Sequence, residues 1–240
     1  NIISDSIIEA HTFARVVKED PKVPGLLYAG TETGLFISYN DGNDWHRMQL
    51  NLPVVPINDL TIRNNDLIAA TAGRSFWILD DLNPIQSVLK LDQEISLLEP
   101  RETPLYIGGR SASNSTLGQN PNSGVMIDYF LPAEMDSSRV KMEIYKGEKL
   151  IRSYANKSDP NYKSWTGGPG KPVLLSTKKG FNRLVWNFRK DNVEAVEKVF
   201  VYGDYSGSFV APGDYKIKLV VDSFSFESNV TVSPNPNLPY

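Results

Sequence analysis

The second half of the chain alternates between apolar and polar residues with a period of two, the pattern of a β-strand with one face in water. Residues 140–145 and 183–189 alternate in this way. Towards the C-terminus, four apolar side chains share one face: Phe224, Phe226, Val230 and Val232. Lys146-Gly147 and Asp222-Ser223 are suited to hairpin turns. The pattern predicts about seven antiparallel strands, the content of an immunoglobulin-like (Ig-like) sandwich.

The first half consists of shorter strand-like runs between Gly, Asn, Asp and Pro residues. The pattern predicts strands at residues 13–18, 26–31, 35–39, 46–50, 57–63, 66–71 and 76–80. LYAGTETGLF, which starts at Leu27, has a second copy, LIAATAGRSF, which starts forty residues later at Leu67. At this offset Phe36 matches Phe76. A repeat of about 40 residues in β-type sequence is typical of the blades of a β-propeller.

Two copies are too few for a complete propeller, because a ring takes about four to eight blades. The second copy also lacks the polar loop and tryptophan that follow the first, and terminal repeats are often atypical. The chain begins at Asn1 rather than at a methionine. We therefore expect a fragment that holds the last blades of a larger propeller, with the upstream blades of the same parent protein as its partners.

The composition divides the chain into three parts. Residues 1–107 are predicted to form the terminal propeller blades, with residues 95–107 adding a strand to the last one. Residues 108–123, GGRSASNSTLGQNPNS, have the composition of a flexible linker. Residues 124–240 are predicted to form the sandwich, with long loops at 156–179 and 191–211. The expected fold is all-β: terminal β-propeller blades followed by an Ig-like antiparallel β-sandwich.

Composition excludes several classes of function. Charged residues are 22% of the chain and the net charge is −3, without a basic stripe, which argues against nucleic-acid binding. The absence of cysteine excludes thiol catalysis, thiolate-bound metals and disulfides. No apolar run approaches the ~20 residues of a membrane span. We expect no cofactor and no metal site.

The segment Ser38–Trp45, SYNDGNDW, fits the Asp-box pattern Ser-x-Asp-x-Gly-x-Thr-Trp at three positions. Asn40 stands at the aspartate position and Asp44 at the threonine position. In this pattern the third side chain accepts amide hydrogen bonds, the glycine permits a positive φ and the tryptophan packs the loop onto its blade. We interpret the motif as structural, through Ser38, Asn40, Gly42 and Trp45. The alternative is that Asp41 and Asp44 bind a cation, although the spacing is not that of an EF-hand.

Longer runs add a family resemblance. LLYAGTETGLFISYNDGNDW, LNLPVVPINDL and AATAGRSFWILDDL together resemble the C-terminal end of bacterial Asp-box (BNR) repeat propellers of the sortilin-like group. KGFNRLVWNFRK and APGDYKIKLVV resemble the Ig-like domain of flagellar hook-capping proteins, through Gly180, Asn182, Trp186, Pro212, Gly213 and Tyr215. The resemblance implies an extracytoplasmic protein, whether periplasmic, secreted or at the cell surface. The histidine that usually precedes Gly73 in such propellers is Ala72 here, so no role of that histidine carries over.

The resemblance also implies a competing function, because such proteins are frequently described as glycoside hydrolases or sialidases. Sialidases use an arginine cluster, and this chain offers Arg15, Arg63 and Arg74. Arg74 is the candidate channel residue; its alternative is a solvated arginine in a turn. Asp80 and Asp81 are adjacent on a strand end and point to opposite faces, which argues against a pair of catalytic carboxylates. We assign no catalytic residue.

Aromatic residues in the two long loops are the remaining candidates. Trp165 lies in the first loop, and Tyr202 and Tyr205 lie in the second. Such side chains either stack on a glycan or contact a protein partner, or they pack the loops onto the domain. The sequence thus favours a non-catalytic scaffold and interaction fragment. The alternatives are the C-terminal part of a sialidase-like or glucanase-like glycoside hydrolase, and a carbohydrate-binding module.

Overall fold

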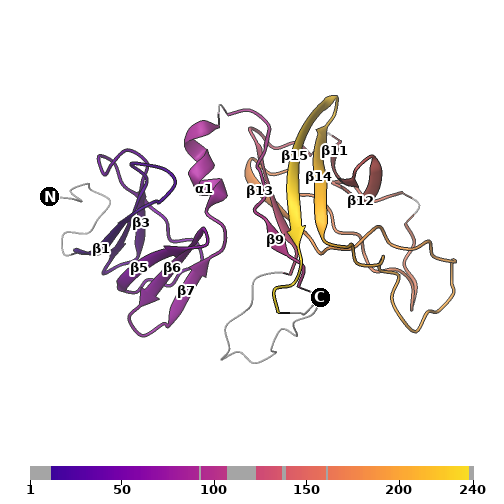
Figure 1. Cartoon of the computed structure of the whole chain (residues 1–240), viewed down its shortest axis with the longest axis horizontal. Coiled ribbons are helices and arrows are strands. Elements are labelled where there is room, and N and C mark those ends of the chain that lie inside the picture. The colour runs from indigo at the N-terminus through magenta and orange to yellow at the C-terminus, as the bar shows by residue number, and fades with distance from the viewer. Residues whose placement is uncertain (1–11, 92, 107–122, 137–138, 161, 238–240) are drawn as a thin grey trace. The chain divides into compact units, whose positions relative to one another are not determined.

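A computed structural model describes residues 12–91, 93–106, 123–136, 139–160 and 162–237 (Figure 1). Almost all regular structure in these ranges is β, which confirms the all-β prediction. The chain divides into two compact units, residues 1–90 and 91–240. Each unit is described by itself below.

The first unit contains two antiparallel sheets. The first sheet has the order β1-β2-β3-β4 and the second sheet β5-β6-β7. Their bounds are β1 (Ala14–Glu19), β2 (Leu27–Thr31), β3 (Leu35–Ser38), β4 (His46–Arg47), β5 (Ile57–Arg63), β6 (Asp66–Thr71) and β7 (Phe76–Leu79). These strands fall where the apolar runs predict them, and only β4 is markedly shorter.

The second sheet has no fourth strand among the described residues. A short helix α1 (Asn83–Ser87) and a 3₁₀ turn η1 (Val88–Lys90) follow β7 instead. Pro84 lies in the first turn of α1, where its missing N–H costs no hydrogen bond. A five-residue helix is too short for an apolar period to reveal it in the sequence.

The two sheets differ by one residue in the turn before their third strand. Ala29 pairs with Phe36 in the first sheet, whereas Ala69 pairs with Trp77 in the second. From the third strand onward the structural offset is therefore 41 residues, and Trp77 takes the position of Phe36. The predicted match of Phe36 with Phe76 is wrong, because one extra turn residue moves every following side chain to the other face.

The second unit is a β-sandwich of a three-stranded and a five-stranded sheet, with the orders β13-β10-β8 and β12-β11-β14-β15-β9. Its strands are β8 (Ser96–Leu97), β9 (Thr103–Pro104), β10 (Val125–Leu131), β11 (Val140–Lys146), β12 (Lys149–Ala155), β13 (Gly180–Trp186), β14 (Gly213–Val221) and β15 (Phe224–Ser233). Trp186 lies at its centre, edge-on to Tyr215 at 5.1 Å between ring centroids. The Tyr215 hydroxyl donates to the Ala211 carbonyl, a contact like the tyrosine corner of Ig folds.

The domain boundary lies earlier than the sequence composition predicts. β8 pairs with β10 and β9 pairs with β15, so residues 95–106 belong to the sandwich rather than to the last blade. The change of unit falls between Lys90 and Leu91. The predicted linker, residues 108–123, lies outside the described residues except for Ser123.

The long loops of the second unit run along the outer edge of β12. The Asp191 amide donates to the Ile151 carbonyl at 2.9 Å, and the Leu175 amide donates to the Ala155 carbonyl at 3.0 Å. An uncovered strand edge is a template for aggregation, and these loops cover this one.

Candidate functional site

The Asp-box loop between β3 and β4 is held by its own side chains. Ser38 Oγ accepts from the Gly42 amide at 2.9 Å, and Asn40 Oδ1 accepts from the Asp44 amide at 2.8 Å. Gly42 has φ 83°, a backbone angle that glycine adopts without strain. The Trp45 indole N–H donates to the Gly42 carbonyl at 3.0 Å, and its buried ring packs with Ala29 and Phe36.

The Asp44 carboxylate is engaged within this loop, because Asn40 Nδ2 donates to Asp44 Oδ2 at 2.7 Å. The Asp41 side chain is exposed, and its backbone amide donates to the Gly25 carbonyl at 2.9 Å. Within the described ranges no group of three or more His, Cys, Asp or Glu residues is arranged to hold a metal ion. The contacts of the loop are those of a structural motif that fastens the β3–β4 connection to the first sheet.

Each sheet of the first unit has two faces. The front face of the first sheet, which carries Tyr28, Leu35 and Ile37, packs against the back face of the second sheet, which carries Leu60, Ala69 and Trp77. A Cβ atom added at Gly30 would lie 2.7 Å from Ile57 Cγ2 and 2.8 Å from Val16 Cγ1. The sheets therefore approach too closely there for a larger residue.

A buried polar network connects the two sheets to α1. Asp20 Oδ2 accepts from the Tyr28 hydroxyl at 3.0 Å and from Gln86 Nε2 at 2.9 Å. The same Gln86 nitrogen donates to Asn65 Oδ1 at 2.9 Å, and Asn65 Nδ2 donates to Asp81 Oδ1 at 3.1 Å. Burial, and then the charge and hydrogen bond of Asp20, raise the pKa of the Tyr28 hydroxyl. Satisfied networks of this kind hold elements in a single arrangement.

A cavity of about 50 Å³ is lined by residues of β3, β6 and β7 and by residues 48–52. Leu35, Met48, Trp77 and Leu79 are among its lining residues. Gln49 also lines it; its Nε2 donates to the Leu52 carbonyl, while its buried Oε1 has no partner among the described residues. Ligand pockets usually measure roughly 300 Å³ or more, so this space does not admit a sugar ring.

The candidate arginines are not brought together. Arg15 lies at the start of β1, where it pairs with Glu32 at 2.6 Å and donates to Asn58 Oδ1 at 3.0 Å. Arg63 lies at the other end of β5, five residues beyond Asn58, which is roughly 17 Å along a strand. The side chain of Arg74 is exposed in the β6–β7 turn. Its role as a channel residue stays a prediction.

The front face of the second sheet is apolar, and no described residue covers it. Ile68 pairs with Ile78 and Ala70 with Phe76, on the side opposite to Ala69 and Trp77. Phe76 is 72% exposed and Ile78 58%. The equivalent front face of the first sheet is buried against the second sheet. The sequence places Phe76 and Ile78 on this front face only when the extra turn residue before β7 is taken into account.

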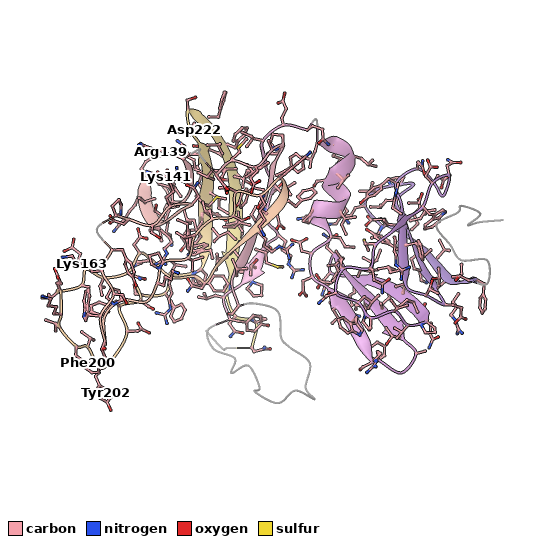
Figure 2. All side chains as sticks on the ribbon, turned by 180° about the vertical axis from the view of Figure 1, so that it is seen from behind. Arg139, Lys141, Lys163, Phe200, Tyr202 and Asp222 are labelled. Carbon is pink, nitrogen blue, oxygen red and sulfur yellow. The ribbon has the colours of Figure 1, made fainter. Side chains whose placement is uncertain are left out.

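The long loops of the second unit form an arm that we define as residues 162–170 and 193–205. The Trp165 indole N–H donates to the Val199 carbonyl at 2.9 Å, and Lys163 pairs with Glu197 at 2.7 Å. Figure 2 shows Phe200 and Tyr202 at the end of this arm, with Lys163 nearer its base. The two aromatic rings meet edge-on at 6.3 Å.

The three aromatic candidates of the sequence have different surroundings. Tyr205 is only 7% exposed and Trp165 is half-buried over Gly168, so both brace the arm. Tyr202 is 98% exposed. Sequence reasoning missed Phe200, which lies over Gly167 and is largely exposed beside Tyr202. Of the original set, only Tyr202 is available for a partner.

No protein-family model matches the chain, and no curated protein is similar to it. Among solved structures, the chain is similar to the extracellular domain of a hybrid two-component system from B. thetaiotaomicron, with 13% identity and a TM-score of 0.26. That match covers 97% of this chain and 26% of the other, so the chain spans about a quarter of the length of that structure. At this TM-score the likeness carries no argument about fold or function. None of the described helices has the length and apolar character needed to cross a membrane.

Proposed function

We propose that this chain is a non-catalytic scaffold: two stacked blades of a larger Asp-box β-propeller, followed by an Ig-like domain. The observation that carries the proposal is that equivalent faces of the two sheets differ in burial. The front face of the first sheet is buried against the back face of the second, and the front face of the second has no cover among the described residues. An apolar sheet face of this kind fits a further sheet of the same repeat.

The surroundings of the candidate residues support a scaffold rather than an enzyme. Asp44, Arg15 and Glu32 are engaged in local hydrogen bonds or ion pairs, and the cavity of the first unit is small. The extracytoplasmic location implied by the family resemblance is part of the proposal.

The test is the association of the chain through this face. An exposed apolar face of this kind leads to contacts between copies of the chain when its natural neighbour is absent. We expect the wild-type chain to associate as its concentration rises in sedimentation velocity, and the Phe76→Lys, Ile78→Lys variant to remain monomeric. Phe13→Lys, Val54→Lys is the matched control, because both residues are exposed apolar residues of the same unit outside the front face. Equal behaviour of all three proteins would contradict the proposal.

A second candidate function is glycan binding at the end of the arm, which the exposure of Tyr202 favours. An exposed aromatic ring on a braced loop is suited to stacking on a sugar. The experiment is a glycan array with the wild-type chain, Tyr202→Ala and Tyr145→Ala. Binding that Tyr202→Ala removes and Tyr145→Ala retains supports this function, and binding that neither substitution changes rejects it.

A further inference from the structure

The third strand of each sheet exposes one row of backbone groups to a possible fourth strand. In the first sheet, the Thr31 amide donates to the Gly34 carbonyl. Because hydrogen-bonded and non-hydrogen-bonded pairs alternate in antiparallel ladders, the backbone groups of Leu35 and Ile37 point away from β2. They meet the segment that contains β4: the Met48 amide donates to the Leu35 carbonyl at 2.9 Å, and His46 pairs with Ile37.

The second sheet repeats this arrangement without the fourth strand. The Thr71 amide donates to the Ser75 carbonyl, so the backbone groups of Phe76 and Ile78 point away from β6. Phe76 and Ile78 are the equivalents of Leu35 and Ile37 at the 41-residue offset. In the part of the chain that the structure describes, no strand pairs with this edge of β7.

The edge of β7 also lacks the usual protection against pairing. Charged side chains, proline, bulges or a covering loop normally guard a strand edge. β1, β4 and β5, the other edge strands of this unit, all carry charged or ionisable residues. The sequence of β7 is FWIL. An edge of four apolar residues fits a strand that pairs in the assembled protein.

We propose that the edge of β7 takes up an extended strand, in the position that residues 46–48 occupy in the first sheet. The occupant is an antiparallel segment with apolar residues at alternate positions, supplied by a further sheet of the proposed ring. This inference rests on the proposed function. It adds the edge of β7 as a second interface beside the front face of the second sheet. The cavity beside Trp77 and Leu79 lies at this edge. A side chain of the added strand opposite Trp77 faces that cavity, as Arg47 lies opposite Phe36 in the first sheet.

The chain itself provides the probe, a peptide with the sequence of residues 43–50, NDWHRMQL. In the first sheet the Met48 N–H donates to the Leu35 carbonyl. In the bound peptide the same N–H donates to the carbonyl of Phe76, the equivalent of Leu35. The Arg47 N–H points away from β7. We therefore expect N-methylation at the Met48 position to weaken peptide binding by about tenfold, the value of one backbone hydrogen bond. N-methylation at the Arg47 position is the matched control and leaves the affinity unchanged.

A variant pair tests the edge from the other side. Ile78→Pro removes an N–H that points away from β6, whereas Ile78→Ala shortens the side chain and retains that N–H. We expect Ile78→Pro to weaken binding about tenfold relative to Ile78→Ala. In wild-type chain, hydrogen exchange at Phe76 and Ile78 slows when the peptide binds.

The outcomes separate the two proposals. Binding that is insensitive to both N-methyl groups, and is lost in Phe76→Lys, Ile78→Lys, overturns strand addition and leaves face-to-face stacking in place. If the peptide does not bind and the chain associates through the front face, strand addition is likewise overturned and stacking is retained. Peptide binding with the predicted N-methyl dependence, in a chain that does not associate, supports strand addition and rejects stacking.

Discussion

The two sheets of the first unit are built from the same repeat and have opposite surroundings. The first sheet has a fourth strand, a front face buried against its neighbour and a back face covered by Trp45. In the described parts of the chain, the second sheet has three strands and a front face without cover, and the helix α1 takes the place of the Asp-box loop. The comparison teaches that a repeat is completed by its neighbours. The apolar pattern is the same in both copies, and among the residues that the structure describes both faces are covered only in the first.

The largest expected effect concerns the cover that only the first sheet possesses. Trp45→Ala removes the ring that packs with Ala29 and Phe36, and such truncations cost about 3–5 kcal/mol. We expect denaturant unfolding of the first unit at clearly lower concentration, with the transition of the sandwich unchanged. Trp165→Ala is the control, because this half-buried ring belongs to the arm. A stability loss confined to the sandwich would contradict the role of Trp45.

A smaller effect distinguishes the buried front face from the open one. Gly30→Ala forces a contact with Ile57 and Val16, and overpacking of this kind costs about 1–3 kcal/mol. Ala70 occupies the equivalent position in the second sheet, and Ala70→Val is expected to change stability by less than about 0.5 kcal/mol. The free energies of unfolding from urea titrations measure both. Equal losses would mean that the front face of the second sheet is covered in solution.

The strand positions, the hairpin turns and the one-faced alternation of the sandwich follow from the sequence because they depend on local periodicity. The structural offset of 41 residues does not follow from the sequence, because aligning Phe36 with Phe76 gives an identical residue and aligning it with Trp77 does not. β8 and β9 are two-residue strands whose pairing depends on partners far along the chain. The network of Asp20, Asn65 and Gln86 joins residues up to 66 positions apart and leaves no spacing signal.

The next effect depends on pH, because one pair of equivalent positions has an ionisable side chain in the first sheet and an apolar one in the second. Tyr28 is buried in the first sheet, and Ile68 is its equivalent in the second. Because burial and Asp20 raise the pKa of Tyr28 in the folded state, stability is fully present below pH about 10 and falls as the pH rises above it. Tyr28→Phe loses about 1–2 kcal/mol near neutral pH, with its hydrogen bond to a buried carboxylate, and shows a smaller loss on going to alkaline pH.

Urea unfolding of wild type and Tyr28→Phe between neutral and alkaline pH measures this difference. Tyr129→Phe serves as the control in the sandwich, where burial raises the pKa of Tyr129 to about 12. The two substitutions are expected to act on different unfolding transitions. An identical alkaline slope in wild type and Tyr28→Phe would show that Tyr28 ionises as readily in the folded chain as in the unfolded one.

The smallest effect concerns the Asp-box loop of the first sheet, which has α1 as its counterpart in the second sheet. Asn40→Ala removes the acceptor of the Asp44 amide and the donor to the Asp44 carboxylate at an exposed site, a loss of about 1 kcal/mol. Asn40→Asp retains the acceptor and restores the aspartate of the Asp-box pattern, but places its charge beside Asp44. We therefore expect Asn40→Asp to be the less stable of the two at low salt and to recover as salt screens the repulsion. A salt-independent difference would indicate that Asp44 leaves the loop in that variant, and hydrogen exchange at the Asp44 amide would detect it.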